Sequence, residues 1–281
     1  MMHEPEKSDA VVVAEKLANK AARSAAEPAE PRACPWLEQG TATKGNAGQQ
    51  STCRGQDRVS VSQALERVRQ VARQRKKERF TALLHHVDPA MLRTAFYALK
   101  RDAAPGVDGT TWETYEQGLD QRIEDLHARV KCGAYRALPS RRRYIPKEDG
   151  SKRPLAVAAL DDKIVQRAVS AVLNVIYEED FLGFSYGFRP GRSQHDALDA
   201  LIVGISSKKV NFVLDADIRS FFTEVSQQWV VRFLEHRIGD KRIIRLVQKW
   251  LRAGVLEDAR ECTNRGVPIL LPCSAGLRGH V

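Results

Sequence analysis

An apolar run that contains two carboxylates constrains the fold of this chain more than any other feature. Residues 210–218 are nearly continuous in apolar side chains until Asp215 and Asp217 interrupt them, and an aromatic pair follows at Phe221 and Phe222. Such a run predicts a buried strand, and a period of two places both carboxylates on one face. A carboxylate within an apolar strand is costly unless a charged partner or a metal ion compensates it. We therefore expect a cation beside this strand.

The two carboxylates allow two interpretations. A strand-end aspartate before an aromatic pair is the arrangement with which nucleotidyl transferases hold Mg²⁺, a hard ion that takes one or two carboxylates plus substrate phosphates. Alternatively, Asp217 caps a turn and Asp215 pairs with a neighbouring arginine. Taken alone, the pattern favours the second, structural interpretation.

The rest of the chain predicts an α+β fold that is rich in helices and contains one β-hairpin. Helix starts are indicated at Ser60 with Gln63, Asp88 with Pro89, Thr110 with Glu113, Asp161, and Ser193, and two more helices at 228–237 and 240–252. Apolar residues recur every three or four positions after these starts, and the third helix runs to Val130. Two short apolar runs flank Asp149-Gly150, which is a strong hairpin signal.

The charge of the chain favours a polyanionic partner. Lysine and arginine total 45 against 35 aspartate and glutamate, a net charge of +10. Each cation set on a phosphate releases condensed counterions, although a soluble protein with a basic surface is an equal alternative. Five cysteines without ligand-like spacing, and no signal peptide, favour reduced thiols. No stretch approaches the ~18 apolar residues that span a bilayer, so we predict a cytoplasmic chain with no membrane contact.

Four motifs precede Asp217 in a specific order. They are PSRRRYIPK (139–147), KRPL (152–155), DDKIVQRA (161–168) and SYGFRPGRS (185–193). With this order and spacing, the chain resembles the group II intron-encoded reverse transcriptases and maturases over residues 58–268. The 105–109 loop and the basic helix at 61–80 resemble the N-terminal extension of that family. The resemblance implies right-hand polymerase-like fingers and an incomplete palm.

The chain then divides into four parts. Residues 1–58 are expected to be a disordered, basic, low-complexity tail, because they hold too few large apolar residues to offset the entropy of ordering. Residues 59–136 form a helical extension, residues 137–268 the fingers and partial palm, and residues 269–281 an aberrant tail.

The resemblance implies a nucleotide site. Asp217 matches the first metal-binding aspartate of the palm, the backbone carbonyl of Ile218 adds a ligand for Mg²⁺, and Phe222 stacks under the deoxyribose. The cations expected to meet the incoming deoxynucleoside triphosphate are Arg153 and, as weaker candidates, Lys147 and Lys152. Arginine suits this role because its planar fork binds phosphate bidentately.

The resemblance also implies a surface that binds intron RNA and an RNA/DNA hybrid. On the helical extension the implied contacts are Arg67, Arg69, Arg73, Arg75, Lys76 and Lys77. In the fingers they are Arg141, Arg142, Arg143, Tyr186 and Arg189. Two alternatives stay open: the three strand arginines form a solvated face, and Phe188 belongs to the core. No oligomeric state is predicted.

The sequence departs from the family after Pro268. The family continues with Gln-Gly-Gly and a later aromatic-Ala-Asp-Asp hairpin, whereas the only Asp-Asp here is Asp161-Asp162, at a helix start that suits capping and the helix dipole. Two metal ions ~3.5–4 Å apart need more carboxylates than Asp217. We expect a frameshift or internal deletion, an RNA-directed DNA polymerase by family that is inactive alone, and low solubility. The alternatives are an intron-RNA-binding, maturase-like module and a non-functional remnant.

Overall fold

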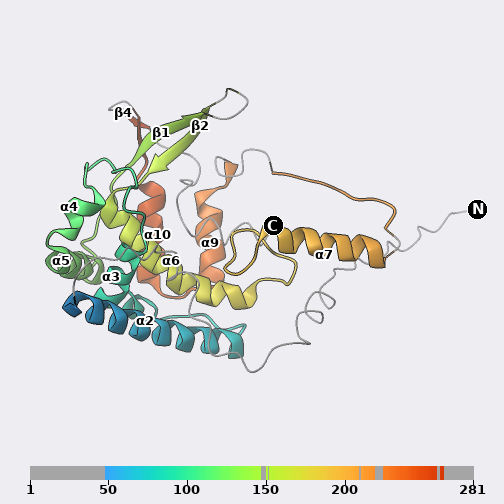
Figure 1. The fold of residues 1–281 in the computed structure, drawn as a ribbon, viewed down its shortest axis with the longest axis horizontal. Coiled ribbons are helices and arrows are strands. Elements are labelled where there is room, and N and C mark those ends of the chain that lie inside the picture. The colour runs from blue at the N-terminus through green and yellow to red at the C-terminus, as the bar shows by residue number, and fades with distance from the viewer. Residues whose placement is uncertain are drawn as a thin grey trace, which may run out of the picture.

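The computed structural model describes residues 48–146, 150, 152–208, 210–218, 224–257 and 260–262. They form a helix-rich α+β fold with one small mixed sheet (Figure 1). The helices are α2 (Gly48–Gln74), η2 (Leu84–His86), α3 (Pro89–Tyr97), α4 (Trp112–Glu116), α5 (Leu119–Cys132), α6 (Leu160–Asp180), α7 (Gln194–Ser207), α9 (Gln227–Arg237) and α10 (Lys241–Arg252). The strands are β1 (Ser140–Pro146), β2 (Lys152–Val157), β3 (Val255–Glu257) and β4 (Arg260–Cys262). The aberrant tail expected at 269–281, and residues 1–47 of the expected disordered tail, lie outside the described residues.

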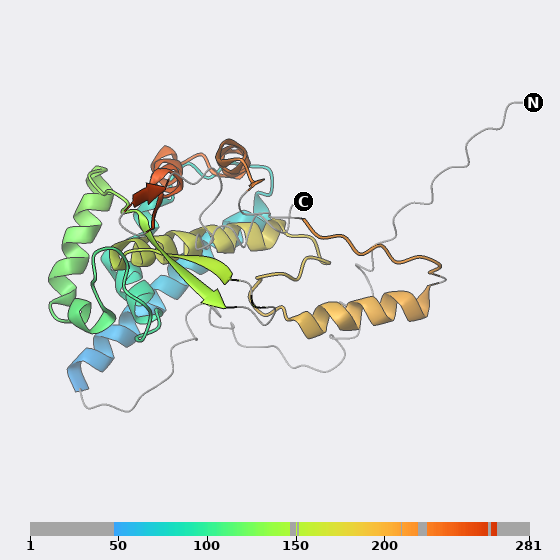
Figure 2. The same ribbon diagram turned by 90° about the horizontal axis from the view of Figure 1, so that it is seen from above.

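Helix α6 is the central element of the fold. Apolar side chains cover most of its circumference, and Ile164, Val165, Ala168, Val169 and Val172 are fully buried. A helix with so wide an apolar face is stable only when neighbours cover it. Helices α2 and α3 pack against it, and α2 runs alongside it in both views (Figures 1 and 2). One continuous core joins α6 to side chains of α2, α3, α5, α9 and α10.

Helix α2 buries one side against α3 and α6. Val61, Leu65, Val68 and Ala72 recur three or four residues apart and are buried. The predicted helix start at Ser60 is wrong, because α2 begins at Gly48 and passes through that position. Residues 56–74 contain neither proline nor glycine, so the helix continues across a residue that would also suit a cap.

Helices α4 and α5 replace the single helix predicted from Thr110 to Val130. Thr111 is the N-cap, and its hydroxyl accepts a hydrogen bond from the backbone N–H of Thr114 at 3.3 Å. Gly118 has a φ of 80°, which glycine adopts without a steric penalty, and the helix breaks there. The three-to-four-residue apolar period continues across the break and therefore does not reveal it.

Three other predicted helix starts are confirmed. The Asp88 side chain accepts a hydrogen bond from the backbone N–H of Met91 at 2.7 Å and caps α3. Ser193 and Asp196 form a capping box at the start of α7. Asp240 caps α10.

The predicted hairpin is confirmed as the antiparallel pair β1–β2, which runs from Arg141 opposite Val157 to Pro146 opposite Lys152. The strand order in the sheet is β2-β1-β3-β4, with β3 parallel to β1 and antiparallel to β4. The sequence did not reveal β3 and β4, because three-residue strands carry too little pattern to detect.

The predicted buried strand at 210–218 is wrong. These residues form no helix or strand, and Phe212 and Leu214 are 92% and 91% exposed. The preceding helix α7 projects away from the helical core in both views (Figures 1 and 2), and none of its residues is buried. An apolar run becomes a buried strand only beside a strand that can pair with it and a layer that covers it, and within the described part of the chain this segment has neither.

Candidate functional site

The two predicted catalytic-site carboxylates lie in the exposed segment after α7. Asp215 and Asp217 are both exposed, and Ile218 next to them is 50% exposed. The structural alternative, in which Asp215 pairs with an arginine, is not observed: neither carboxylate forms an ion pair with any residue whose side chain the structure describes. The carboxylates are therefore accessible to an external ligand.

The oxygen atoms that this segment exposes are of the chemical type that binds magnesium. Mg²⁺ is commonly held by one or two carboxylates together with substrate phosphates, and Asp215, Asp217 and the Ile218 carbonyl offer such hard donors. When bound, the ion would neutralise charge on phosphate oxygens. The described portion of the chain contains no group of three or more His, Cys, Asp or Glu side chains placed to hold a metal ion. The donors at this segment thus fit the chemistry of magnesium without forming a complete protein cage.

The strand arginines of the hairpin have different surroundings. Arg142 lies 3.6 Å from a carboxylate oxygen of Glu257 on β3, and the Tyr144 hydroxyl donates a hydrogen bond to the same carboxylate. Arg143 is exposed, whereas Arg141 is half-buried. The solvated-face alternative therefore fits Arg143 better than its two neighbours.

Several predicted nucleotide contacts are outside what the structure describes. Lys147, Phe222 and the side chain of Arg153 are in this group, and their roles stay predictions. Lys152, at the start of β2, is exposed.

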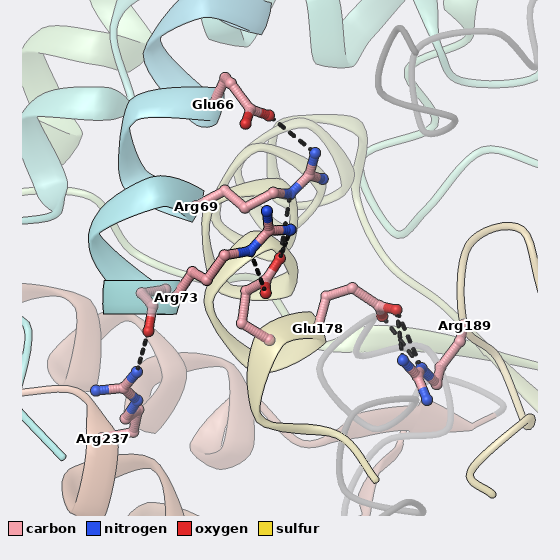
Figure 3. Close-up of polar contacts among 8 residues, drawn as sticks. Glu66, Arg69, Arg73, Glu178, Arg189 and Arg237 are labelled. Atoms are coloured by element: carbon pink, nitrogen blue, oxygen red, sulfur yellow. Dashed lines mark hydrogen bonds and ion pairs between the residues drawn. The ribbon is translucent and has the colours of Figure 1, made fainter. Parts of the chain in front are cut away.

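Arg189 is engaged within the fold. Its side chain is buried and its Nη2 donates to Glu178 at 2.6 Å (Figure 3), while its Nη1 donates to the carbonyls of Leu182 and Ser185 at 3.0 and 2.8 Å. These donors hold the loop after α6, and the template contact stays a prediction. Phe188 beside it is 60% exposed with a φ of 58°, so it does not belong to the core.

The predicted basic cluster on α2 separates into paired and unpaired cations. Arg73 binds both oxygens of Glu179 on α6 at 3.1 and 3.2 Å, and Arg69 lies 2.9 Å from Glu66 (Figure 3). Arg75 pairs with Glu78 at 3.1 Å. The remaining members, Arg67, Lys76 and Lys77, are exposed and form no ion pair with a carboxylate in the described part of the chain. These three cations are the ones available to a polyanion.

Arg237 is a buried residue that the sequence gave no reason to single out. It donates to Asp180 at 2.8 Å and to the carbonyl oxygens of Arg75 and Ala72 at 2.8 and 3.2 Å. Figure 3 shows Arg237 at the end of α2. Its guanidinium thereby satisfies carbonyls that a helix end leaves without intrahelical partners. Because Lys76 and Lys77 follow directly, Arg237 fixes the position of the free cations.

The only Asp-Asp of the chain serves the fold. Asp161 accepts hydrogen bonds from the Tyr115 hydroxyl at 2.7 Å and from Arg129 at 2.9 Å. Asp162 is buried and accepts from the Tyr135 hydroxyl and, at 3.0 Å, from the backbone N–H of Leu138. Burial raises the pKa of Asp162 to about 6. Both carboxylates lie in the first turn of α6, as the dipole argument predicts, but neither caps the helix through its side chain.

Comparison with known proteins identifies the family. Residues 145–277 match the reverse transcriptase (RNA-dependent DNA polymerase) family. Protein YkfC of Escherichia coli is 35% identical over 168 residues, which are 58% of this chain and 44% of that protein. The group II intron-encoded protein LtrA of Lactococcus lactis is 30% identical over 222 residues, 77% of this chain and 37% of that protein. The chain contains a reverse transcriptase domain with group II intron-encoded relatives.

The reverse transcriptase domain match begins at residue 145, near the end of β1, and includes β2, α6, α7 and Asp217. It also includes residues 269–277, part of the tail that we expected to be aberrant. The chain spans less than half the length of the curated relatives it matches. Reverse transcriptases bind a nucleic-acid template and use Mg²⁺. No helix in the described ranges is long and apolar enough to cross a membrane.

Proposed function

We propose that these 281 residues form the RNA-binding part of a group II intron-type reverse transcriptase, and that they do not polymerise DNA by themselves. The expected partners are intron RNA and an RNA/DNA hybrid. Deoxynucleoside triphosphate is the substrate expected once the palm is complete.

The RNA-binding half of the proposal rests on a helical body with its own core and a free basic end. Side chains from α2 to α10 form one buried apolar cluster, so this body is built to fold around α6. Arg237 holds the end of α2. Lys76 and Lys77 follow this end; they are exposed and form no ion pair with a carboxylate that the structure describes. Cations held in this way neutralise phosphates and release counterions.

The lack of polymerisation by this polypeptide rests on where its carboxylates are used. Two-metal phosphoryl transfer needs carboxylates beyond the one at Asp217. The only Asp-Asp in the sequence is engaged by tyrosine, arginine and backbone donors at the start of α6. Asp215 and Asp217 are both exposed, and they are the two carboxylates that remain to bind a metal ion at the predicted site.

Two assays on the whole chain test the proposal. Fluorescence anisotropy with a single-stranded RNA, measured over a salt series, should give an affinity that falls as salt rises. Replacing Lys76 and Lys77 with glutamine should reduce the slope of log affinity against log salt by about 1.4, because each contact on a single strand contributes ~0.7. The matched control, Lys100→Gln with Lys131→Gln, removes the same charge from exposed positions elsewhere and should leave the slope unchanged.

Primer extension on poly(rA)/oligo(dT) with Mg²⁺ tests the second half. No product is expected from the wild-type chain. Extension that disappears in Asp217→Asn would contradict the proposal and assign a working catalytic centre to these residues. An affinity for RNA that does not change with salt would leave the non-functional remnant as the better description.

A further inference from the structure

A pocket of about 560 Å³ lies between α2 and the segment from Phe80 to Met91. Its floor is apolar: Val61, Val68 and Leu83 line it and are almost fully buried. Small-molecule sites usually measure ~300–1,000 Å³ and are mostly apolar with a few polar groups that fix orientation. The pocket therefore has the size and the lining of a site for one nucleotide-sized group, and it lies outside the 145–277 family match.

The polar part of the lining is cationic and aromatic. Arg67, His85 and His86 all line the pocket, and the two imidazole rings lie 3.9 Å apart at an interplanar angle of 40°. Arg67 is exposed and has no ion pair with a carboxylate that the structure describes. Asp88 is the one acidic lining residue, and its side chain already caps α3. The lining thus offers two aromatic imidazole rings and a positive charge without a carboxylate partner in the described part of the chain.

The histidines differ in their electrostatic surroundings. Burial lowers the pKa of the His86 imidazole, and the nearby His85 and Arg67 lower it further, while Asp88 acts in the opposite direction. These surroundings favour the neutral form of the His86 ring, and Arg67 supplies a fixed positive charge nearby. A neutral ring near a fixed cation suits a ligand that carries both a flat ring and a phosphate.

We propose that this pocket binds one unpaired nucleotide of an RNA, with its base against the imidazoles and the apolar floor and its phosphate at Arg67. The inference rests on the proposed RNA binding and assigns it a specific subsite. Charge complementarity supports RNA as the occupant, because the chain carries a net charge of +10 and the exposed Lys76 and Lys77 follow directly after α2, the helix that lines the pocket. Bases stack on flat side chains without regard to sequence, so the pocket is expected to tolerate any base.

Titration with AMP tests the pocket directly. In the full chain, AMP should shift the NMR signals of the His85 and His86 rings and leave those of His195 on α7 unchanged. Inorganic phosphate at the same concentration should cause much smaller shifts, because it lacks a base. Shifts caused by a leucine-rich amphipathic peptide but not by AMP would make the pocket a peptide groove and overturn the proposal.

Variants test the same subsite in RNA binding. The double variant His85→Ala with His86→Ala should bind single-stranded RNA about tenfold more weakly, the loss expected for one stacked base, with an unchanged salt slope. Arg67→Gln should instead reduce the salt slope by about 0.7. The control His195→Ala removes an exposed histidine outside the pocket and should bind as the wild type does.

The outcomes separate the two proposals. A wild-type chain with no salt-dependent affinity for RNA would refute the proposed function. Wild-type RNA binding that persists in a folded double variant, with no AMP shifts at His85 and His86, would refute the pocket alone. If the double variant unfolds, as its circular dichroism would reveal, the AMP titration of the wild type decides the question.

Discussion

Replacing Tyr135 with phenylalanine removes one hydroxyl from the best-buried polar network of the fold. Tyr135 is fully buried; its hydroxyl donates to Asp162 and accepts a hydrogen bond from the Trp250 indole N–H at 2.8 Å. The network joins the segment after α5 to α6 and α10. Tyr135→Phe leaves a carboxylate oxygen and an indole N–H without this partner, and each unsatisfied buried group costs about 1–3 kcal/mol. We expect the free energy of unfolding to fall by about 3 kcal/mol at neutral pH.

The cost should depend on pH in a defined direction. Burial raises the pKa of Asp162 to about 6 from 3.8, so the folded state binds this proton more tightly than the unfolded state. The stability that this proton supplies is complete below the unfolded value and is lost as the pH rises through about 6. The Tyr135 hydroxyl lowers the pKa of Asp162, so removing it raises that pKa further. At pH 5 the variant carboxyl is protonated, so that mainly the cost of the unpaired Trp250 N–H remains, whereas at higher pH the ionised carboxylate also lacks its donor.

Urea unfolding followed by tryptophan fluorescence measures both effects, with wild type and variant compared at pH 5 and pH 7.5. Tyr144→Phe is the matched control, because the Tyr144 hydroxyl also donates to a carboxylate but its side chain is 49% exposed. Its urea midpoint should stay at the wild-type value. The reasoning fails if Tyr135→Phe unfolds at the same urea concentration as Tyr144→Phe. It also fails if the cost of Tyr135→Phe is equal at the two pH values.

Three further variants probe other parts of the fold. In Gly106→Ala the new Cβ would lie 2.5 Å from the backbone Cα of Ala159, so overpacking should lower the free energy of unfolding by about 2–3 kcal/mol in urea denaturation, and a neutral result would contradict the close approach. Arg237→Met removes a buried guanidinium, leaves the half-buried Asp180 carboxylate and helix-end carbonyls without this partner, and should cost about 3 kcal/mol; retention of the wild-type melting temperature would refute this. Phe212→Ser with Leu214→Ser should reduce light scattering of concentrated protein without changing the urea midpoint, because both side chains are exposed, and a lowered midpoint would show that the segment is part of the core.

The parts of the fold that the sequence predicted depend on local chemistry. The caps at Asp88 and Ser193 and the hairpin around Gly150 each need only a few adjacent residues, and their signals are independent of what packs nearby. The helix at Asp161 was also predicted, because its apolar residues recur at helical spacing.

The parts that were mispredicted depend on tertiary surroundings. The apolar pattern at 210–218 predicts a buried strand if another strand lies beside it to pair with. The pattern does not show whether such a strand is present. The break between α4 and α5 had a local signal in Gly118, but the uninterrupted apolar period outweighed it. The ion pair of Arg189 with Glu178 could not be predicted from the sequence, because the loop between them sets which side chains meet.

One local signal did point to a tertiary junction. Glu178, Glu179 and Asp180 end α6, where the negative end of the helix dipole and their mutual repulsion disfavour three carboxylates. Such a run is reasonable only if cations from other segments compensate it.

The structure supplies those cations from three different directions. Arg189 comes from the following loop and Arg73 from α2, and they meet Glu178 and Glu179 (Figure 3). Arg237 comes from α9 and meets Asp180. Replacing the three carboxylates with amides would therefore relieve repulsion within α6 and at the same time release α2, α9 and the loop that leads to α7. Since the isolated helix would gain stability while the fold would lose it, an acidic helix end of this kind indicates a junction of several elements. This junction joins the basic end of α2 to the chain that leads toward Asp217.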